Sequence, residues 1–253
     1  VVPLDLVLFA GPVILRDAFR KIDWHGRDVR IVPVAHEDSS YFSALAEQLR
    51  DAQGRILPTL VRRYAGVELS QVDQVALTAY SAGHGLLNKV GAVPADARRL
   101  SAMLLHDATF AGFNDPPKAG YVAMGRRAID GDGLMVSTTS TASGPGYLSG
   151  RDSWMRVWSE LMRETGKQPY EVKPGGGLVA AGSWWQLGSR LTWCDSNLSH
   201  VGNHDAAAVV WQQFLAPWFS RWRWIEPALV GAVVSSLALG ARYWWHRRRR
   251  MVS

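Results

Sequence analysis

Short apolar runs alternate with segments of helical spacing over the first 220 residues of the chain. Nearly continuous apolar runs predict buried strands at residues 4–10, 29–34, 72–80, 101–105 and 134–138. Helical spacing predicts helices at residues 39–64 (with a break at Gly54 or Pro58), 82–90, 117–129, 151–163 and 205–219. Residues 174–199 are rich in Gly and Trp and have no clean period. The alternation predicts an α/β fold, in which a mainly parallel sheet carries helices on both faces.

A different pattern follows this domain, which we take to end at residue 220. Residues 227–241 carry no charge, and residues 227–245 together approach the roughly 20 residues with which a helix crosses a bilayer. Tryptophan and tyrosine flank both ends of this run, and four arginines follow at residues 247–250. The pattern predicts a juxtamembrane segment at 221–226, a transmembrane helix at 227–245 and a basic cytoplasmic tail at 246–253. A buried helix or an amphipathic surface helix would suit a run that is apolar on all sides less well.

The formal net charge of +6 belongs to this C-terminal part of the chain. Seven arginines follow residue 220 and only Glu226 opposes them, so residues 1–220 sum to zero. A neutral domain argues against nucleic acid as the main partner. More cations follow the predicted span than precede it, which predicts a single-pass membrane protein with its domain on the non-cytoplasmic side.

One motif in the domain indicates chemistry. The predicted strand 72–80 leads into Ser81, which is followed by Ala82 and Gly83 and then by a predicted helix. This is the setting of a nucleophile elbow, in which a sharp turn raises a serine hydroxyl above the sheet and aims the next N–H at an oxyanion. The usual pattern is G-x-S-x-G, and here Ala79 replaces the first glycine. A phosphate-binding turn is the alternative, but residues 83–88 lack the third glycine of G-x-G-x-x-G.

A serine nucleophile requires a base and an orienting carboxylate, in the chain order Ser, acid, His for such a fold. Asp107 follows the next predicted strand and is the candidate acid, although an aspartate there often only caps a helix. The following strand offers no carboxylate before Asp152. His200 and His204 precede the last predicted helix. We favour His200 as the base and keep His204 as the alternative, because His204 adjoins Asp205, the predicted N-cap of that helix.

The sequence resembles the α/β-hydrolase superfamily over residues 4 to about 219. The resemblance rests on Phe-Ala-Gly-Pro at 9–12, Tyr-Ser-Ala-Gly-His at 80–84, Leu-His-Asp-Ala-Thr-Phe at 105–110 and Ser-His at 199–200. The chain is most similar to bacterial and phage relatives whose acid follows the strand after the elbow and whose next strand leads into a loop of small residues, as at 136–146.

The resemblance implies an α/β-hydrolase-like fold in which Ser81 is the nucleophile, Asp107 the acid and His200 the base. It also implies that the Ala82 N–H is one donor of the oxyanion hole. The second donor of the family comes from the loop after the first strand. Pro12, which has no N–H, lies in that loop here, so Gly11 or Val13 would have to supply the donor.

The expected activity is that of a membrane-anchored serine hydrolase of the esterase or lipase kind, with no metal and no organic cofactor. The single cysteine, Cys194, excludes an intrachain disulfide framework and a zinc site built from cysteines. The expected substrate is a small-molecule, lipid or cell-envelope ester, with an amide as the less favoured bond. Tryptophans at 154, 158, 184, 185 and 193 would suit acyl chains or glycan rings at a cavity mouth, but core packing is the commoner role of such residues.

Two other classes of function are compatible with the sequence. A catalytically inactive α/β-hydrolase fold could serve as a membrane-tethered binding or assembly module, which Pro12 and Ala79 favour slightly. A nucleotide-binding Rossmann-like domain is the second of these alternatives.

Overall fold

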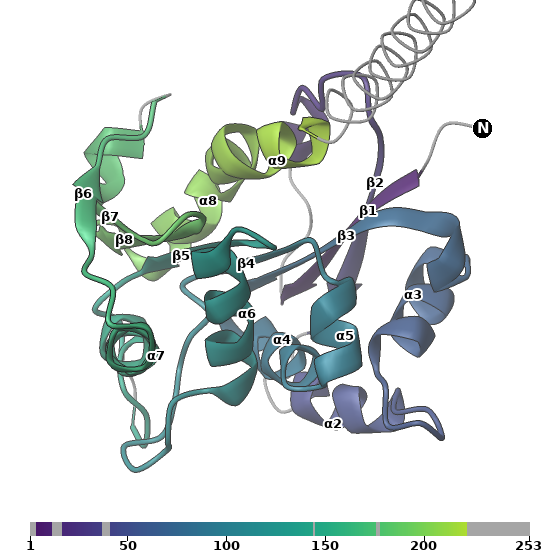
Figure 1. Cartoon of the computed structure of the whole chain (residues 1–253), viewed down its shortest axis with the longest axis horizontal. Helices are drawn as coiled ribbons and strands as arrows, with labels where there is room; N and C mark the ends of the chain where they lie inside the picture. Colours follow the sequence, from purple (N-terminus) through teal and green to yellow (C-terminus); the bar gives the residue numbers. More distant parts are fainter. Residues whose placement is uncertain (1–3, 12–16, 37–40, 144, 176–177, 222–253) are drawn as a thin grey trace, which may run out of the picture.

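A single mixed sheet organises the protein (Figure 1). The computed structural model describes residues 4–11, 17–36, 41–143, 145–175 and 178–221. Its eight strands lie in the order β2-β1-β3-β4-β5-β8-β7-β6. In chain order they are β1 (Leu4–Gly11), β2 (Asp28–Ala35), β3 (Val72–Tyr80), β4 (Ala102–His106), β5 (Leu134–Thr139), β6 (Tyr170–Val172), β7 (Gly182–Leu187) and β8 (Leu191–Ser196). Strands β1 to β5 and β8 are parallel, whereas β7 runs antiparallel to both of its neighbours, β8 and β6. The predicted α/β class with a mainly parallel sheet is confirmed.

Helices cover both faces of this sheet (Figure 1). One face packs against α2 (Tyr41–Gln48), α3 (Leu57–Ala65), α4 (His84–Gly91), α5 (Pro94–Arg99), α6 (Ala119–Asp130) and α7 (Gly150–Thr165). The other face packs against α1 (Asp17–Arg20), α8 (His200–Val210), the π-turn η4 (Trp211–Leu215) and α9 (Ala216–Ser220). Short 3-10 turns lie at η1 (Leu69–Gln71), η2 (Ser81–Gly83) and η3 (Leu178–Ala181).

The burial of each strand explains how clearly its hydrophobic pattern predicts it from the sequence. The central strands β4 and β5 are buried at every position, so they appear as unbroken apolar or small-residue runs. Strand β2 lies at one end of the sheet and alternates exposed with buried positions. Pro33 is compatible with a strand there because an edge strand can spare one ladder hydrogen bond.

Two local expectations need correction. The last helix of the domain begins at His200, not near residue 205, and its N-cap is Ser199, not Asp205. The Ser199 hydroxyl accepts a hydrogen bond from the Gly202 N–H at 3.0 Å, which satisfies one of the open donors of the first turn. Within the region 174–199, residues 182–196 form the antiparallel hairpin β7–β8, whose turn contains Gly188 in the left-handed conformation (φ 66°).

Four of the five tryptophans singled out in the sequence belong to the interior. Trp154, Trp158, Trp184 and Trp193 are all buried, so the core reading holds for these four. Trp184 also donates its indole N–H to the Leu178 carbonyl at 2.8 Å.

The predicted transmembrane helix at 227–245, most of the juxtamembrane segment and the basic tail lie outside the described residues. Within the described part of the chain, no helix combines the length and the hydropathy that a membrane span requires.

Candidate active site

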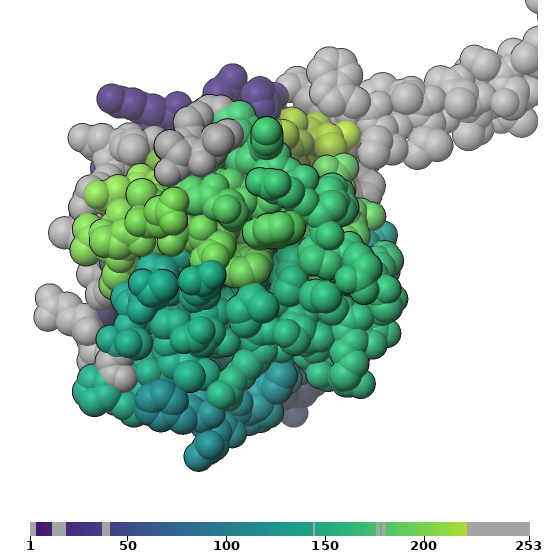
Figure 2. Space-filling model, turned by 90° about the vertical axis from the view of Figure 1, so that its left-hand side faces the viewer, coloured from purple at the N-terminus to yellow at the C-terminus, as the bar shows by residue number. Residues whose placement is uncertain are grey.

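Three of the residues singled out in the sequence lie at the carboxyl edge of the sheet: Asp107 and His200 contact each other, and Ser81 lines the same cavity as His200. Ser81 follows β3, Asp107 follows β4, and His200 opens α8 after the last strand. Strands β3 and β4 are parallel neighbours, with Tyr80 beside His106, so the residues that follow them start from adjacent positions. In the space-filling view, the yellow-green segment of α8 borders the teal segments from the middle of the chain (Figure 2).

Ser81 and Asp107 share a backbone conformation that side chains rarely adopt. Their φ angles are 52° and 47°, and His25 is the one other residue besides glycine with a positive φ in the described part of the chain. Such a conformation costs on the order of 1–3 kcal/mol per residue, and it persists where the surrounding structure over-determines it. Strain of this kind at two neighbouring strand ends is typical of a functional site.

Close backbone contact fixes the turn at Ser81. A Cβ atom on Gly83 would lie 2.1 Å from the carbonyl oxygen of Ala10, so only glycine fits beside β1 at this point. A Cβ on Gly85 would lie 2.4 Å from the Ser43 hydroxyl of α2. Ala79 is fully buried in the regular part of β3. The turn therefore needs small residues after the serine, as the motif predicts.

The Asp107 carboxylate is fully buried and held by three donors. Its Oδ1 accepts from the Ser140 N–H at 2.9 Å, and its Oδ2 accepts from the Ser140 hydroxyl at 2.5 Å. His200 Nδ1 lies 2.6 Å from the same Oδ2. On the other side, a Cβ on Gly150 would lie 2.2 Å from Oδ1. Hydrogen bonds offset the cost of burying this charge, and the close backbone leaves it one position.

The contact to Asp107 favours one tautomer of the His200 ring. An imidazole that donates Nδ1–H to a carboxylate has Nε2 as its free acceptor when it is neutral. The ring stacks on Tyr80 with centroids 4.6 Å apart and meets the edge of Phe110 at 5.7 Å. Two aromatic neighbours and one carboxylate thus orient the imidazole, and the side chain keeps 30% of its surface exposed.

Ser81 and His200 line one cavity of about 420 Å³. Its wall also contains the aromatic rings of Phe110 and Tyr147, which pack edge to face at 5.3 Å. The remaining lining residues are Ala82, His84, Ala111, Gly112, Asp115, Lys118 and Ala142. Asp107 is not part of the lining, because it lies buried on the other side of His200.

The other histidines considered have different surroundings. His84 lines the cavity, and its Nδ1 lies 3.1 Å from the Ser81 carbonyl oxygen. Desolvation lowers the pKa of His84 to about 4, so the ring is neutral at pH 7. His204, the alternative base, is 2% exposed and packs against Phe9, Phe19 and Tyr80. The described residues around the cavity do not include it, and the carboxylate beside it is Asp205, at 3.4 Å, rather than Asp107.

The expected oxyanion donors are only partly described. Ala82 lines the cavity, next to Ser81. Gly11 ends β1 beside Tyr80, where a Cβ would lie 3.0 Å from the Tyr80 carbonyl oxygen. Pro12 and Val13 lie outside the described residues.

Several residues of this site were not predicted from the sequence. Ser140, Gly150, Tyr80 and Phe110 contact the Asp107–His200 pair from four different elements or loops. The loop of small residues after β5 was the only available signal, and it did not single out Ser140.

Fold and site together define an α/β protein whose mainly parallel sheet carries a serine, a histidine and a buried aspartate at its carboxyl edge. No protein-family model matches the sequence, and no curated protein matches it either.

Proposed function

We propose that this protein is a serine hydrolase of the α/β-hydrolase type that cleaves an ester bond. The observation that carries the proposal is the 2.6 Å contact between His200 Nδ1 and the buried Asp107 carboxylate, with Ser81 and His200 lining the same cavity. The left-handed backbone of Ser81 between a buried strand and a helix supports the same reading.

In the proposed reaction, His200 Nε2 removes the proton of the Ser81 hydroxyl as its oxygen attacks the substrate carbonyl carbon. Asp107 stabilises the resulting imidazolium and keeps the ring in its orientation. The Ala82 N–H and a second donor from Gly11 or Val13 bind the oxyanion. His200 then gives its proton to the leaving oxygen, and the acyl group remains on Ser81. Water, deprotonated by His200, releases the acid and restores the hydroxyl.

The cavity wall favours a substrate with an apolar part. Phe110 and Tyr147 offer two aromatic rings to it, and Lys118 and Asp115, whose charged atoms are 3.9 Å apart, form its polar side. A lipid or cell-envelope ester, or a small ester, fits these surroundings. Residues 227–245 would anchor the chain in a membrane, with the domain on the non-cytoplasmic side.

A fluorophosphonate probe tests the proposal, because it reacts covalently only with an activated serine. We expect one label per chain, lost in Ser81→Ala and kept in Ser183→Ala, which removes an exposed hydroxyl on β7. No labelling of the folded wild-type protein would contradict the hydrolase assignment.

The second candidate is a catalytically inactive fold that serves as a membrane-tethered binding module. Pro12 favours it, since this residue cannot donate an N–H in the loop where the resemblance places the second oxyanion donor. A folded protein that takes up no probe but binds a ligand in the Ser81 cavity would support this candidate.

A further inference from the structure

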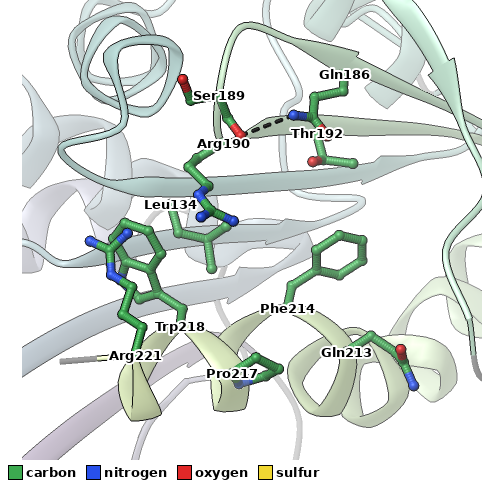
Figure 3. A pocket seen from close by; sticks show the side chains of 10 residues that line it. All are labelled: Leu134, Gln186, Ser189, Arg190, Thr192, Gln213, Phe214, Pro217, Trp218 and Arg221. Atoms are coloured by element: carbon green, nitrogen blue, oxygen red, sulfur yellow. Dashed lines mark hydrogen bonds between the residues drawn. The ribbon is translucent and has the colours of Figure 1, made fainter. Parts of the chain in front are cut away.

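A second cavity lies between the β7–β8 hairpin and the C-terminal end of the domain (Figure 3). Its volume is about 170 Å³, which is small enough to suit an ion or one polar group rather than a large ligand. Arg190 reaches it from the hairpin, and Arg221 reaches it from the end of α9. The other lining residues are Leu134, Gln186, Ser189, Thr192, Gln213, Phe214, Pro217 and Trp218.

The two arginines lie against one indole ring. The guanidinium carbon of Arg190 is 5.7 Å from the centre of the Trp218 ring, and the guanidinium of Arg221 stacks on the same ring. Burial lowers the pKa of Arg221 to about 10, the charge of Arg190 acts in the same direction, and the charge of Asp132 opposes both with a smaller effect. The residues that line the cavity include no Asp or Glu. Two guanidinium groups that line one small cavity are well placed to bind an anion.

The hairpin turn that carries Arg190 is fixed to α6. The N–H groups of Ser189 and Arg190 donate to the carbonyls of Ile129 and Ala128 at 3.0 and 2.8 Å. Gly188 is left-handed, and a Cβ there would lie 2.7 Å from the Ile129 carbonyl oxygen. The backbone beneath Arg190 is therefore preorganised, which reduces the entropy lost on binding.

An unsatisfied donor lies in the same cluster. Trp218 is 4% exposed, and its indole N–H has no acceptor among the described residues. A buried donor without a partner is costly, and an anion or a water molecule in the cavity would offer one.

We propose that this cavity binds a phosphate group through Arg190 and Arg221. Inorganic phosphate and the phosphodiester of a lipid headgroup share this chemistry. Five residues separate Arg221 from Pro227, where the proposed membrane span begins, so the cavity lies within roughly 20 Å of it along the chain. The anion site itself does not depend on the proposed hydrolase activity.

The first test is a phosphate titration of the full chain in a neutral detergent, followed by thermal unfolding and by calorimetry. We expect saturable binding that raises the melting temperature, and no comparable effect of potassium chloride at equal ionic strength. Arg190→Gln and Arg221→Gln should each weaken binding by about tenfold or more, because each removes a charge-assisted hydrogen bond. Arg163→Gln is the matched control, since Arg163 is 69% exposed on α7 and its loss changes the net charge equally.

The second test separates the two sources of phosphate, with dihexanoylphosphatidylglycerol below its micelle concentration as the lipid probe. Tighter binding of this lipid than of phosphate, lost in Arg190→Gln, identifies a headgroup site. Equal or tighter binding of phosphate identifies a site for the free ion. Absence of saturable binding of both ligands, or equal weakening in Arg163→Gln and Arg190→Gln, would overturn the proposal. If Arg221→Gln does not fold, the comparison rests on Arg190, which is exposed and lies on a turn held by backbone bonds.

Discussion

At the scale of single residues, the carboxylate of Asp107 is the most constrained group of the candidate site. Ser140 and His200 donate hydrogen bonds to its two oxygens, and the backbone of Gly150 lies against the remaining side. Its own left-handed backbone adds a further restriction. The position of the His200 ring therefore depends on a residue that is fully buried and does not line the cavity of Ser81.

This constraint predicts the effect of Gly150→Ala. Alanine favours a helix over glycine by about 1 kcal/mol, yet its Cβ would lie 2.2 Å from Asp107 Oδ1, so the carboxylate must move. We expect a loss of kcat of about 10²-fold, since misplacement of a catalytic group by 1 Å has effects of this size. Kinetics on a chromogenic ester measure it, and Asp107→Asn should lose still more.

Gly133→Ala is the control, because its Cβ would meet only ordinary contacts at 3.7 Å. Unchanged kcat in folded Gly150→Ala would show that the Asp107 position does not matter for the reaction.

The identity of Ser81, Asp107 and His200 could be predicted because each follows a strand or opens a helix that the sequence pattern indicates. Their partners could not be predicted in this way. Ser140 and Gly150 are ordinary residues of a loop and of a helix start, and only the fold brings them to Asp107. Such roles depend on tertiary contact, which a single sequence does not encode locally.

At the scale of elements, the π-turn η4 connects the last helices to the centre of the sheet. Trp211 of this turn donates its indole N–H to Nε2 of His106, at the end of β4, over 3.0 Å. His106 is fully buried, and desolvation, with a smaller effect of His204, lowers its pKa to about 3. The ring is therefore neutral in the folded protein at pH 7.

The buried ring of His106 predicts how stability depends on pH. Its pKa is below the ordinary value near 6.5, so the unfolded chain binds the proton more readily than the folded protein. This contribution to stability is complete above about pH 6.5 and is lost as the pH falls toward about 3. His106→Gln, which keeps an acceptor for Trp211, should flatten the dependence by up to about 1.4 kcal/mol per pH unit.

Urea unfolding of both proteins between pH 5 and 7.5 measures the two slopes. Equal slopes for wild type and His106→Gln would contradict the buried neutral histidine, whatever the difference in absolute stability.

Elements were predictable where burial imposes a clear period. The central strands and the amphipathic helix α7 are of this kind. The hairpin β7–β8 was not predicted, because its tryptophans pack into the core from positions that do not alternate cleanly. The start of α8 was predicted too late, since Ser199 competes with Asp205 as a cap and only the fold decides between them.

At the scale of the whole molecule, the neutral domain is followed by a C-terminal part that carries all of the net positive charge and contains the proposed membrane anchor. We expect the full chain to stay in the membrane fraction after alkaline carbonate extraction, because residues 227–241 carry no charge and residues 227–245 approach the length of a membrane span. In cells whose outer layers have been removed and whose cytoplasmic membrane is intact, added protease should digest the domain without permeabilisation of that membrane.

A cytoplasmic marker protein that stays intact in the same sample is the control. Digestion of the domain only after permeabilisation would contradict the proposed orientation. Release of the chain from the membrane fraction by carbonate would contradict the proposed transmembrane helix.

Helix α6 joins the two cavities of the domain. Lys118, directly before its first turn, lines the cavity of Ser81, and the carbonyls of Ala128 and Ile129 in its last turn hold the hairpin of Arg190. The helix has 12 residues, so it is about 18 Å long and has one cavity at each end. Thermodynamic linkage then relates the two proposed ligands. Whatever factor the proposed anion imposes on the affinity for the proposed ester, the ester must impose on the affinity for the anion in return.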